Sequence, residues 1–231
     1  MTIGATMPGH KTDAMKPIRL TLCKPFEKIP TGSSRFWGNP DLPSPVVYPT
    51  YIGEDGQEWE YQFVCQINLA DIADLDVENR LPHKGLLSFF AKIDHYLGRF
   101  DDGSGISGYI SDPADVKVLY FPDVTDDFQE AVLVDDDEEW LNPAEFEIKF
   151  ERTLPDIYHE DHALFAEPTH REWDTWDPPF EDWQILLQID SFSGMDFNLN
   201  FMDFGVLDFL ISPDDLAAAR FDNIRAIVLS T

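Results

Sequence analysis

The sequence is poor in basic residues. Its 231 residues include 16 Lys and Arg against 44 Asp and Glu, which gives a formal net charge of −28 at pH 7. A surface of this sign repels phosphate backbones and the headgroups of anionic lipids. The composition therefore excludes nucleic acids and membrane surfaces as main partners, and it favours a partner that is itself basic.

Cysteine and long apolar runs are also scarce. The two cysteines, Cys23 and Cys65, lie in strand-like segments, where reduced and buried thiols are more common than a disulfide. No apolar run approaches the ~18 residues of a transmembrane helix, and residues 1–16 lack the apolar segment of a secretion signal. We therefore expect a cytoplasmic protein in which residues 1–17 form a flexible tail and residues 18–231 form a single domain.

The common catalytic motifs are missing as well. The sequence contains no phosphate-binding loop, dinucleotide fingerprint, nucleophile elbow or Cys-x-x-Cys pair. The most metal-like cluster is His159, His162 and His170, but its first two histidines are three residues apart, not four as on a zinc-protease helix. Residues 190–203 are rich in oxygen ligands but lack EF-hand spacing. At both places we favour an acidic loop without a metal or cofactor; zinc and calcium binding are the alternatives.

The apolar content is high enough for a core. Hydrophobic residues make up 43% of the chain and aromatic residues 13%, so the chain can fold despite its charge. Apolar and polar residues alternate with period two in residues 18–22, which predicts a half-buried strand. Further strands are predicted, from composition and flanking turn residues, at 58–67, 85–93, 116–121, 145–150, 183–189, 205–211 and 223–229.

Helical signals are few. Residues 213–220 are preceded by Ser212, a good N-cap, and begin with Pro213, which suits the first turn of a helix. Residues 68–75 have the apolar spacing of a second short helix. Together with the strands, these patterns predict an α+β fold that is mostly β, with few short helices.

Two parts of the sequence follow the same order of elements. A strand that contains Gln66 is followed 19 residues later by Gly85, and a strand that contains Gln188 is followed 17 residues later by Gly205; a third strand follows each glycine. Three such strands cannot bury an apolar face alone. We therefore predict a duplicated β module, approximately residues 58–121 and 183–229, whose copies pack about a pseudo-twofold axis.

Each of the two glutamines is flanked by apolar residues. A buried amide left without partners is costly, so we expect Gln66 and Gln188 to hydrogen-bond with crossing backbone. The alternative is a shared polar pocket to which Asn68 and Asp190 contribute.

Acidic and aromatic residues gather in two segments of the second half. The first is the run Asp135, Asp136, Asp137, Glu138 and Glu139, inside a stretch without Lys or Arg. It is a solvated loop, a docking patch for a basic protein or a cation site. The second contains Trp173 and Trp176, which either fill the core or contact a partner. These seven residues form the candidate partner-binding site.

An ordered set of segments resembles the YwqG-like family of bacterial proteins, a family of unknown function. The segments are residues 38–43, 66–69, 81–90, and 188–190 with 205–210. The resemblance implies a mostly β, α+β fold with duplicated halves, and it implies no reaction, because no catalytic motif carries over. The genomic setting of some members, near toxin and immunity clusters, implies an inhibitory binding role.

The sequence thus predicts a non-catalytic, acidic binding protein that engages a basic protein partner, with an immunity or antitoxin-like role as one form of that function. The alternative is a small-molecule- or metal-dependent enzyme that uses carboxylates in the cleft between the two halves. Whether the protein is an enzyme stays open at this point.

Overall fold

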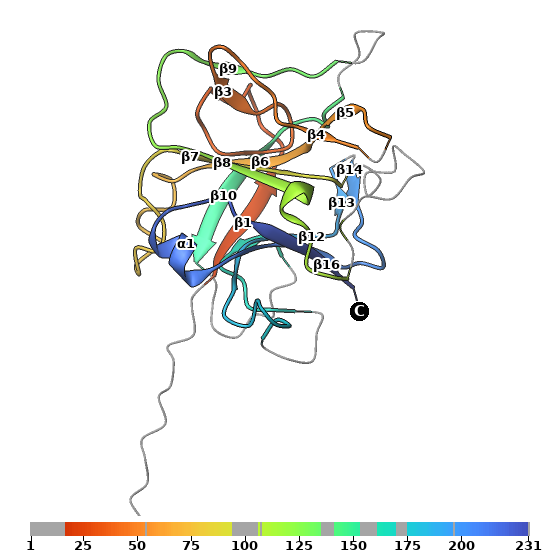
Figure 1. Cartoon of the computed structure of the whole chain (residues 1–231). Helices are drawn as coiled ribbons and strands as arrows, with labels where there is room; N and C mark the ends of the chain where they lie inside the picture. The colour runs from red at the N-terminus through yellow and green to blue at the C-terminus, as the bar shows by residue number, and fades with distance from the viewer. Residues whose placement is uncertain are drawn as a thin grey trace, which may run out of the picture.

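One large β-sheet dominates the computed structural model of the chain (Figure 1). The structure describes residues 17–53, 55–93, 106, 108–134, 141–152, 161–169, 175–195 and 197–230, except for the side chain of Phe197. The large sheet has ten strands in the order β16-β15-β12-β11-β1-β10-β2-β6-β7-β8. Their bounds are β1 Ile18–Cys23, β2 Arg35–Phe36, β6 Gln62–Asn68, β7 Leu86–Ala91, β8 Val116–Phe121, β10 Phe146–Arg152, β11 Ala163–Leu164, β12 Gln184–Asp190, β15 Val206–Ile211 and β16 Arg225–Leu229.

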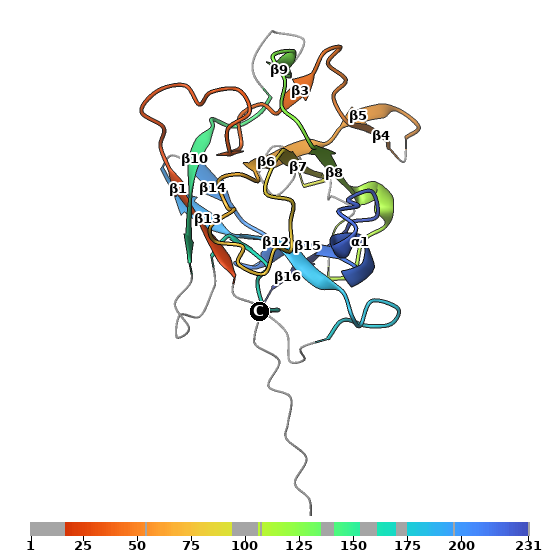
Figure 2. The ribbon, with the colours of Figure 1, turned by 90° about the vertical axis from the view of Figure 1, so that its left-hand side faces the viewer.

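Three small two-stranded sheets accompany the large one. They pair β3 (Asp41–Pro43) with β9 (Phe128–Glu130), β4 (Thr50–Ile52) with β5 (Glu58–Glu60), and β13 (Phe192–Gly194) with β14 (Phe197–Leu199). The first two pairs lie together at one end of the molecule, at the top of Figures 1 and 2.

The prediction of an α+β fold is wrong, because the described residues are almost entirely β and irregular. The one α-helix among them, α1 (Pro213–Ala217), has five residues, and one 3-10 turn, η2 (Pro113–Asp115), precedes β8. We expected residues 68–75 to be helical, but Asn68 ends β6 and residues 69–75 form successive turns. A helix of this length is only marginally stable, and the turns already bury Leu69 and Ile72.

The helix predicted at residues 213–220 forms as α1, and it begins at the expected N-cap, Ser212. The backbone N–H of Asp215 donates to Ser212 Oγ at 3.1 Å, and Pro213 occupies the first turn. The helix ends at Ala217, three residues earlier than predicted.

No helix in the described part of the chain combines the length and apolar character needed to cross a membrane.

The large sheet curls until its two edge strands approach each other. In Figure 2, β1 and β10 form one wall, β6–β8 lie above the interior, and β12, β15 and β16 lie below it. Ser111, before β8, joins the opposite edge: its backbone N–H donates to the Ala226 carbonyl at 2.7 Å, and its Oγ accepts from Ala226 N–H at 2.9 Å. The sheet is therefore a nearly closed barrel.

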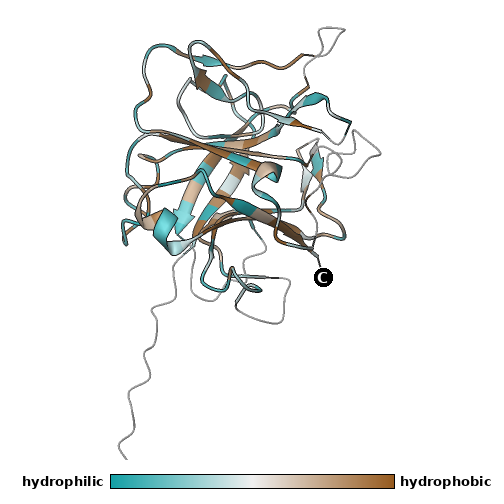
Figure 3. Cartoon of the chain, viewed as in Figure 1, coloured by the Kyte–Doolittle hydropathy of each residue, from teal (hydrophilic) through white to brown (hydrophobic). Residues whose placement is uncertain are grey.

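The interior of this barrel is the main hydrophobic core, and all ten strands contribute buried side chains to it. Figure 3 shows the hydrophobic residues in brown along these strands. The alternation predicted for residues 18–22 is visible in β1, where Ile18 and Leu20 are each 1% exposed.

The strand order is symmetric about its centre. The set β6-β7-β8 corresponds to β12-β15-β16, β2 corresponds to β11, and the central neighbours β1 and β10 correspond to each other. In the first set Gln66 faces Ser88. In the second, Gln188 faces Asp208 in the same register. Both ladders also have a register irregularity just before the glutamine, between Phe63 and Cys65 in the first and between Ile185 and Leu187 in the second. The pairing pattern therefore has pseudo-twofold symmetry.

The backbone repeats this correspondence in detail. Trp37 and Phe165, which follow β2 and β11, have positive φ angles of 55° and 56°. Trp37 N–H donates to the Val64 carbonyl at 2.9 Å, and Phe165 N–H donates to the Leu186 carbonyl at 3.2 Å. The correspondence extends beyond the segments proposed as copies. Their origin by duplication, like the domain limits, stays a prediction.

Candidate functional site

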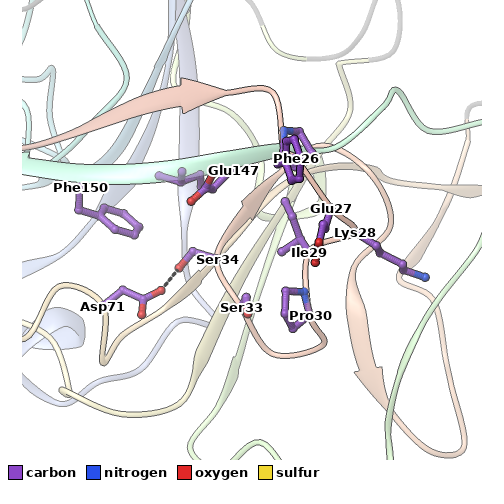
Figure 4. Close-up of a pocket in the computed structure, with 12 residues that line it drawn as sticks. Phe26, Glu27, Lys28, Ile29, Pro30, Ser33, Ser34, Asp71, Glu147 and Phe150 are labelled. Carbon is purple, nitrogen blue, oxygen red and sulfur yellow. Dashed lines mark hydrogen bonds between the residues drawn. The ribbon is translucent and has the colours of Figure 1, made fainter.

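A pocket of about 580 Å³ opens beside the loop that joins β1 to β2 (Figure 4). The loop forms one side of it, the turn after β6 contributes Asp71, and β10 contributes Glu147, Ile148 and Phe150. The lining residues from the loop are Pro25, Phe26, Glu27, Lys28, Ile29, Pro30, Ser33 and Ser34. Because β10 is the neighbour of β2 in the strand order, the pocket lies beside the half of the sheet that contains β10, β2 and β6.

Local hydrogen bonds position the wall of this pocket. Ser34 Oγ donates to Asp71 Oδ2 at 2.7 Å and accepts from the backbone N–H of Asn68 at 2.8 Å (Figure 4). On the loop, Ile29 is 6% exposed, and its backbone N–H donates to Glu145 Oε1 at 3.0 Å. The loop is therefore anchored at both ends of the pocket wall.

Three carboxylates give the pocket its charge: Glu27, Asp71 and Glu147. Lys28 is the cation among the lining residues, but its ammonium forms an ion pair with Glu130, which does not line the pocket. The hydrogen bond to Glu130, and then the attraction between the two charges, raises the pKa of Lys28. The positive charge of Lys28 is thus used elsewhere, and the pocket remains acidic.

The other lining residues are mostly apolar. Phe26 is 99% exposed, the highest value among the large hydrophobic side chains of the described residues. Phe150 is half-buried, and Ile29 and Ile148 are buried. Carboxylates beside aliphatic and aromatic surface are complementary to a cation on an alkyl chain.

A buried charged network lies directly behind the loop. Arg35 on β2 has a side chain that is 1% exposed; its Nη2 lies 2.8 Å from Asp41 Oδ2 and its Nη1 lies 3.2 Å from Glu145 Oε2. Asp41 Oδ2 also accepts from the N–H of Gly32 at 2.8 Å and from Gln66 Nε2 at 2.6 Å. These bonds hold the loop on the sheet. Since water cannot reach the pair, we assign it a structural role.

Both glutamines bond as predicted. Gln66 Nε2 donates to the Ser33 carbonyl at 2.8 Å, and Gln188 Nε2 donates to the Asp161 carbonyl at 3.0 Å. Gln66 also receives the N–H of Asp41 on its Oε1, at 2.9 Å.

The second half has the same framework without the charged pair. Ala163 faces Gln188 where Arg35 faces Gln66, so alanine replaces arginine there. Thr169 Oγ1 lies 3.4 Å from Gln188 Oε1, in the position that Asp41 has in the first half. The charged network is therefore a feature of the half that carries the pocket.

His162 is another difference between the halves. Its Nδ1 accepts the backbone N–H of Asp190 at 3.1 Å, as Ser34 Oγ accepts that of Asn68. The ring is buried, and burial lowers the pKa of His162 to about 4, against the attraction of Asp161. The histidine is thus neutral at pH 7 and acts as a hydrogen-bond acceptor.

The residues predicted to bind a partner are only partly described. The run Asp135, Asp136, Asp137, Glu138 and Glu139 lies outside the described residues, and so does Trp173. Trp176 is described: it is 3% exposed, and its indole N–H donates to the Trp183 carbonyl at 3.1 Å. It packs in a small core cluster with residues of β11, β12, β15 and β16, so the structure places it in the core.

The predicted metal-binding alternatives are partly outside the described residues too. His159, His170 and Asp196 are not described. Within the part that is described, no group of three or more His, Cys, Asp or Glu side chains is arranged to hold a metal ion.

Sequence reasoning missed the pocket and the buried arginine. Arg35 carries no sequence signal of burial, because arginine is rarely buried unless it is paired. Its partner Glu145 is 110 positions away, so no local pattern could reveal the pair.

Comparison with known proteins identifies the family of the chain. No curated protein matches the chain. A family described as "Domain of unknown function (DUF1963)" matches residues 34–228, which include both corresponding sets of strands nearly to the end of β16. The match covers well over half of the 231 residues, and the chain therefore belongs to the DUF1963 family.

Proposed function

We propose that the protein is a non-catalytic binding protein whose acidic surface engages a basic protein partner. The observation that carries this proposal is the excess of carboxylates over basic residues, a net charge of −28. Seven described Lys and Arg side chains are already engaged in ion pairs within the chain: Arg19, Lys28, Arg35, Arg80, Lys84, Lys92 and Arg220. Their charges are offset locally, which leaves the surplus of carboxylates to set the surface potential.

An acidic surface of this kind favours fast association with a basic partner and disfavours acidic ones. The run Asp135–Glu139 and Trp173 are the proposed contacts. Trp176, being buried, is expected to support the neighbouring loop rather than to touch the partner.

The finer parts of the proposal rest on the sequence resemblance. They are membership of the YwqG-like group and a role in neutralising a basic toxin. A cytoplasmic location, expected from the composition, is also part of the proposal. The free thiols of Cys23 and Cys65 support a reducing compartment.

The test is capture from native lysate with the tagged full chain at low and high salt, followed by titration of each purified captured protein. We expect a basic protein whose affinity falls as salt rises, because ions screen the attraction. Recovery of no basic protein at low salt would count against the proposal.

A matched pair of charge variants then locates the contact. The first variant changes the run at 135–139 to Asn and Gln. The second neutralises the same number of exposed carboxylates elsewhere: Glu58, Glu60, Asp203, Asp214 and Asp222. If the run is the contact, the first variant weakens binding more than the second, although both lose the same charge.

The pocket favours a second candidate function, an enzyme or a binding protein for a small molecule. Its volume of about 580 Å³ is within the usual range for such sites, and its carboxylates come from three separate segments of the chain. Thermal melts with panels of metal ions and metabolites test this alternative, because a bound ligand raises stability as its concentration exceeds its Kd.

A further inference from the structure

We infer that the pocket beside the β1–β2 loop receives a lysine or arginine side chain of a basic protein. This inference rests on the proposed function and assigns the pocket as the anchor of that interface.

The chemistry of the pocket matches such a side chain along its length. Ile29, Ile148 and Phe150 offer apolar surface for an alkyl stem, while Asp71 and Glu147 offer carboxylates for the charged end. A guanidinium or ammonium group also gains from contact with an aromatic face. A neutral or anionic side chain of the same length would leave the carboxylates without a partner.

Phe26 is the strongest sign that something covers this place. A phenylalanine ring with 99% exposure keeps nearly all of its apolar surface in water, and the flanking Pro25 limits the backbone beside it. In Figure 4 the ring stands at the edge of the pocket beside Glu147. A side chain that enters the pocket would bury the ring and place its own charge near Glu147.

The pocket is also prepared electrostatically. Lys28, the basic residue among those lining it, pairs with Glu130 instead of with a pocket carboxylate. Asp71 is held in place by Ser34 through a neutral hydroxyl, which leaves its negative charge uncompensated by that bond. An incoming cation therefore meets an oriented carboxylate.

The other half of the sheet shows that this charge pattern is not a by-product of the fold. Glu147 faces Arg35 on β2, and the corresponding pair in the second half is Arg19 facing Ala163 on β11. Arg19 there forms an ion pair with Asp161 at 2.8 Å. In the second half, a basic residue thus occupies the position that the pocket carboxylate Glu147 has in the first half.

The experiment uses the isotope-labelled full chain and short capped Gly/Ser peptides with one central residue: Arg, Lys, or the neutral analogues citrulline and norleucine. We expect the Arg and Lys peptides to shift the amide signals around Phe26, Asp71 and Glu147, and the neutral peptides to leave them unchanged. Equal shifts from all four peptides, or none from the basic ones, would overturn the inference.

Substitutions identify the groups involved. Glu147→Gln and Phe26→Ala are expected to weaken binding of the Arg peptide about tenfold each, the equivalent of about 1.4 kcal/mol. The matched controls are Glu151→Gln, four residues along the same strand and not in the pocket, and Phe204→Ala, which is 74% exposed elsewhere. Both are expected to bind as the unchanged protein does. Since Glu147 and Phe26 are exposed, both variants should fold, which thermal melting checks.

The same variants separate this inference from the proposed function. If a basic protein is captured and the Glu147→Gln variant binds it as tightly as the unchanged protein, the pocket inference fails and the proposed function stands. If the basic peptides bind in the pocket but no basic protein is captured, the proposed function fails and the pocket remains a cation-binding site.

Discussion

Phe89 and Phe209 occupy corresponding positions in the two halves of the sheet, and their rings meet edge to face with centroids 5.2 Å apart. Phe89 faces Cys65 on β6, and Phe209 faces Leu187 on β12. Both phenylalanines are 0% exposed. Because two corresponding residues touch each other, the contact lies on the pseudo-twofold axis and joins the two halves in the core.

This contact predicts a coupled pair of mutations. Phe89→Ala and Phe209→Ala should each lower the free energy of unfolding by about 3–5 kcal/mol, since each leaves a cavity in the core. The double variant should lose about 0.5–1.5 kcal/mol less than the sum, because the ring contact can be removed only once. Urea unfolding measures all three variants.

The control for these core mutations is Phe204→Ala, at a ring that is 74% exposed. It should change the free energy of unfolding by less than about 0.5 kcal/mol. Strict additivity of the two core substitutions would show that the halves do not meet as described.

The buried pair Arg35–Asp41 predicts a rescue. Arg35→Ala leaves Asp41 buried without its cation and should cost about 3–5 kcal/mol of unfolding free energy. Adding Asp41→Thr reproduces the Ala163 and Thr169 arrangement of the second half and should restore part of that loss. Glu145 can remain, because its side chain is 19% exposed and can be hydrated. Denaturant titration checks this, and a double variant less stable than Arg35→Ala would contradict it.

His162 predicts a pH dependence of stability. Its pKa is about 4 in the folded protein and about 6.5 in an unfolded chain, so the unfolded state binds the proton more readily. The stabilisation is fully present above pH 6.5 and is lost as the pH falls from about 6.5 through 4, by about 3 kcal/mol in total.

The variant His162→Asn isolates this contribution, because an amide oxygen can still accept the N–H of Asp190 but does not titrate. Between pH 7 and pH 4 the stability difference between the unchanged protein and this variant should move by about 3 kcal/mol in favour of the variant. A constant difference across that range would refute the assignment of a neutral, buried His162.

The glycines that precede β7 and β15 predict a graded set of alanine effects. A Cβ on Gly205 would lie 1.8 Å from the Leu229 carbonyl oxygen, and a Cβ on Gly85 would lie 2.3 Å from that of Phe121, where φ is also +89°. Both substitutions should cost about 3 kcal/mol or more, because the backbone of the next strand must move.

Gly56→Ala is the control for these substitutions. Gly56 also has a positive φ, +77°, but a Cβ there would meet no atom within 4 Å. Its cost should be limited to about 1 kcal/mol of backbone strain. In thermal melting, Gly56→Ala should have a clearly higher melting temperature than Gly85→Ala and Gly205→Ala. Equal melting temperatures would show that the close approach of the neighbouring strand is not the constraint.

The strands of the large sheet could be predicted where their signal is local. The prediction for residues 116–121 coincides with β8, and those for 205–211 and 223–229 differ from β15 and β16 by one or two residues at the start. The prediction of one strand over residues 58–67 is wrong at Tyr61, whose N–H donates to the Pro49 carbonyl. There the chain leaves the β4–β5 pair and enters β6, a change of partner that no local pattern encodes.

The pocket could not be predicted, because its residues come from segments that are far apart in the sequence. Its residues come from the loop after β1, the turn after β6 and strand β10, and none of these segments carries a binding motif by itself. The two-residue strand β2 was also missed, because it is too short to show alternation and lies in a segment rich in proline.

By itself, the amino-acid sequence determined the sign of the surface charge, the apolar content of the core and the positions of most long strands. It also determined that the two glutamine-to-glycine segments repeat the same order of elements. These properties depend on composition and on neighbours within a few residues. The tertiary structure alone decided that the sheet closes through Ser111 and Ala226, that Arg35 is buried between Asp41 and Glu145, and that a pocket forms between the β1–β2 loop, the turn after β6 and β10. Each of these depends on contacts between residues far apart in the chain, whose energy is gained only when the whole sheet has formed.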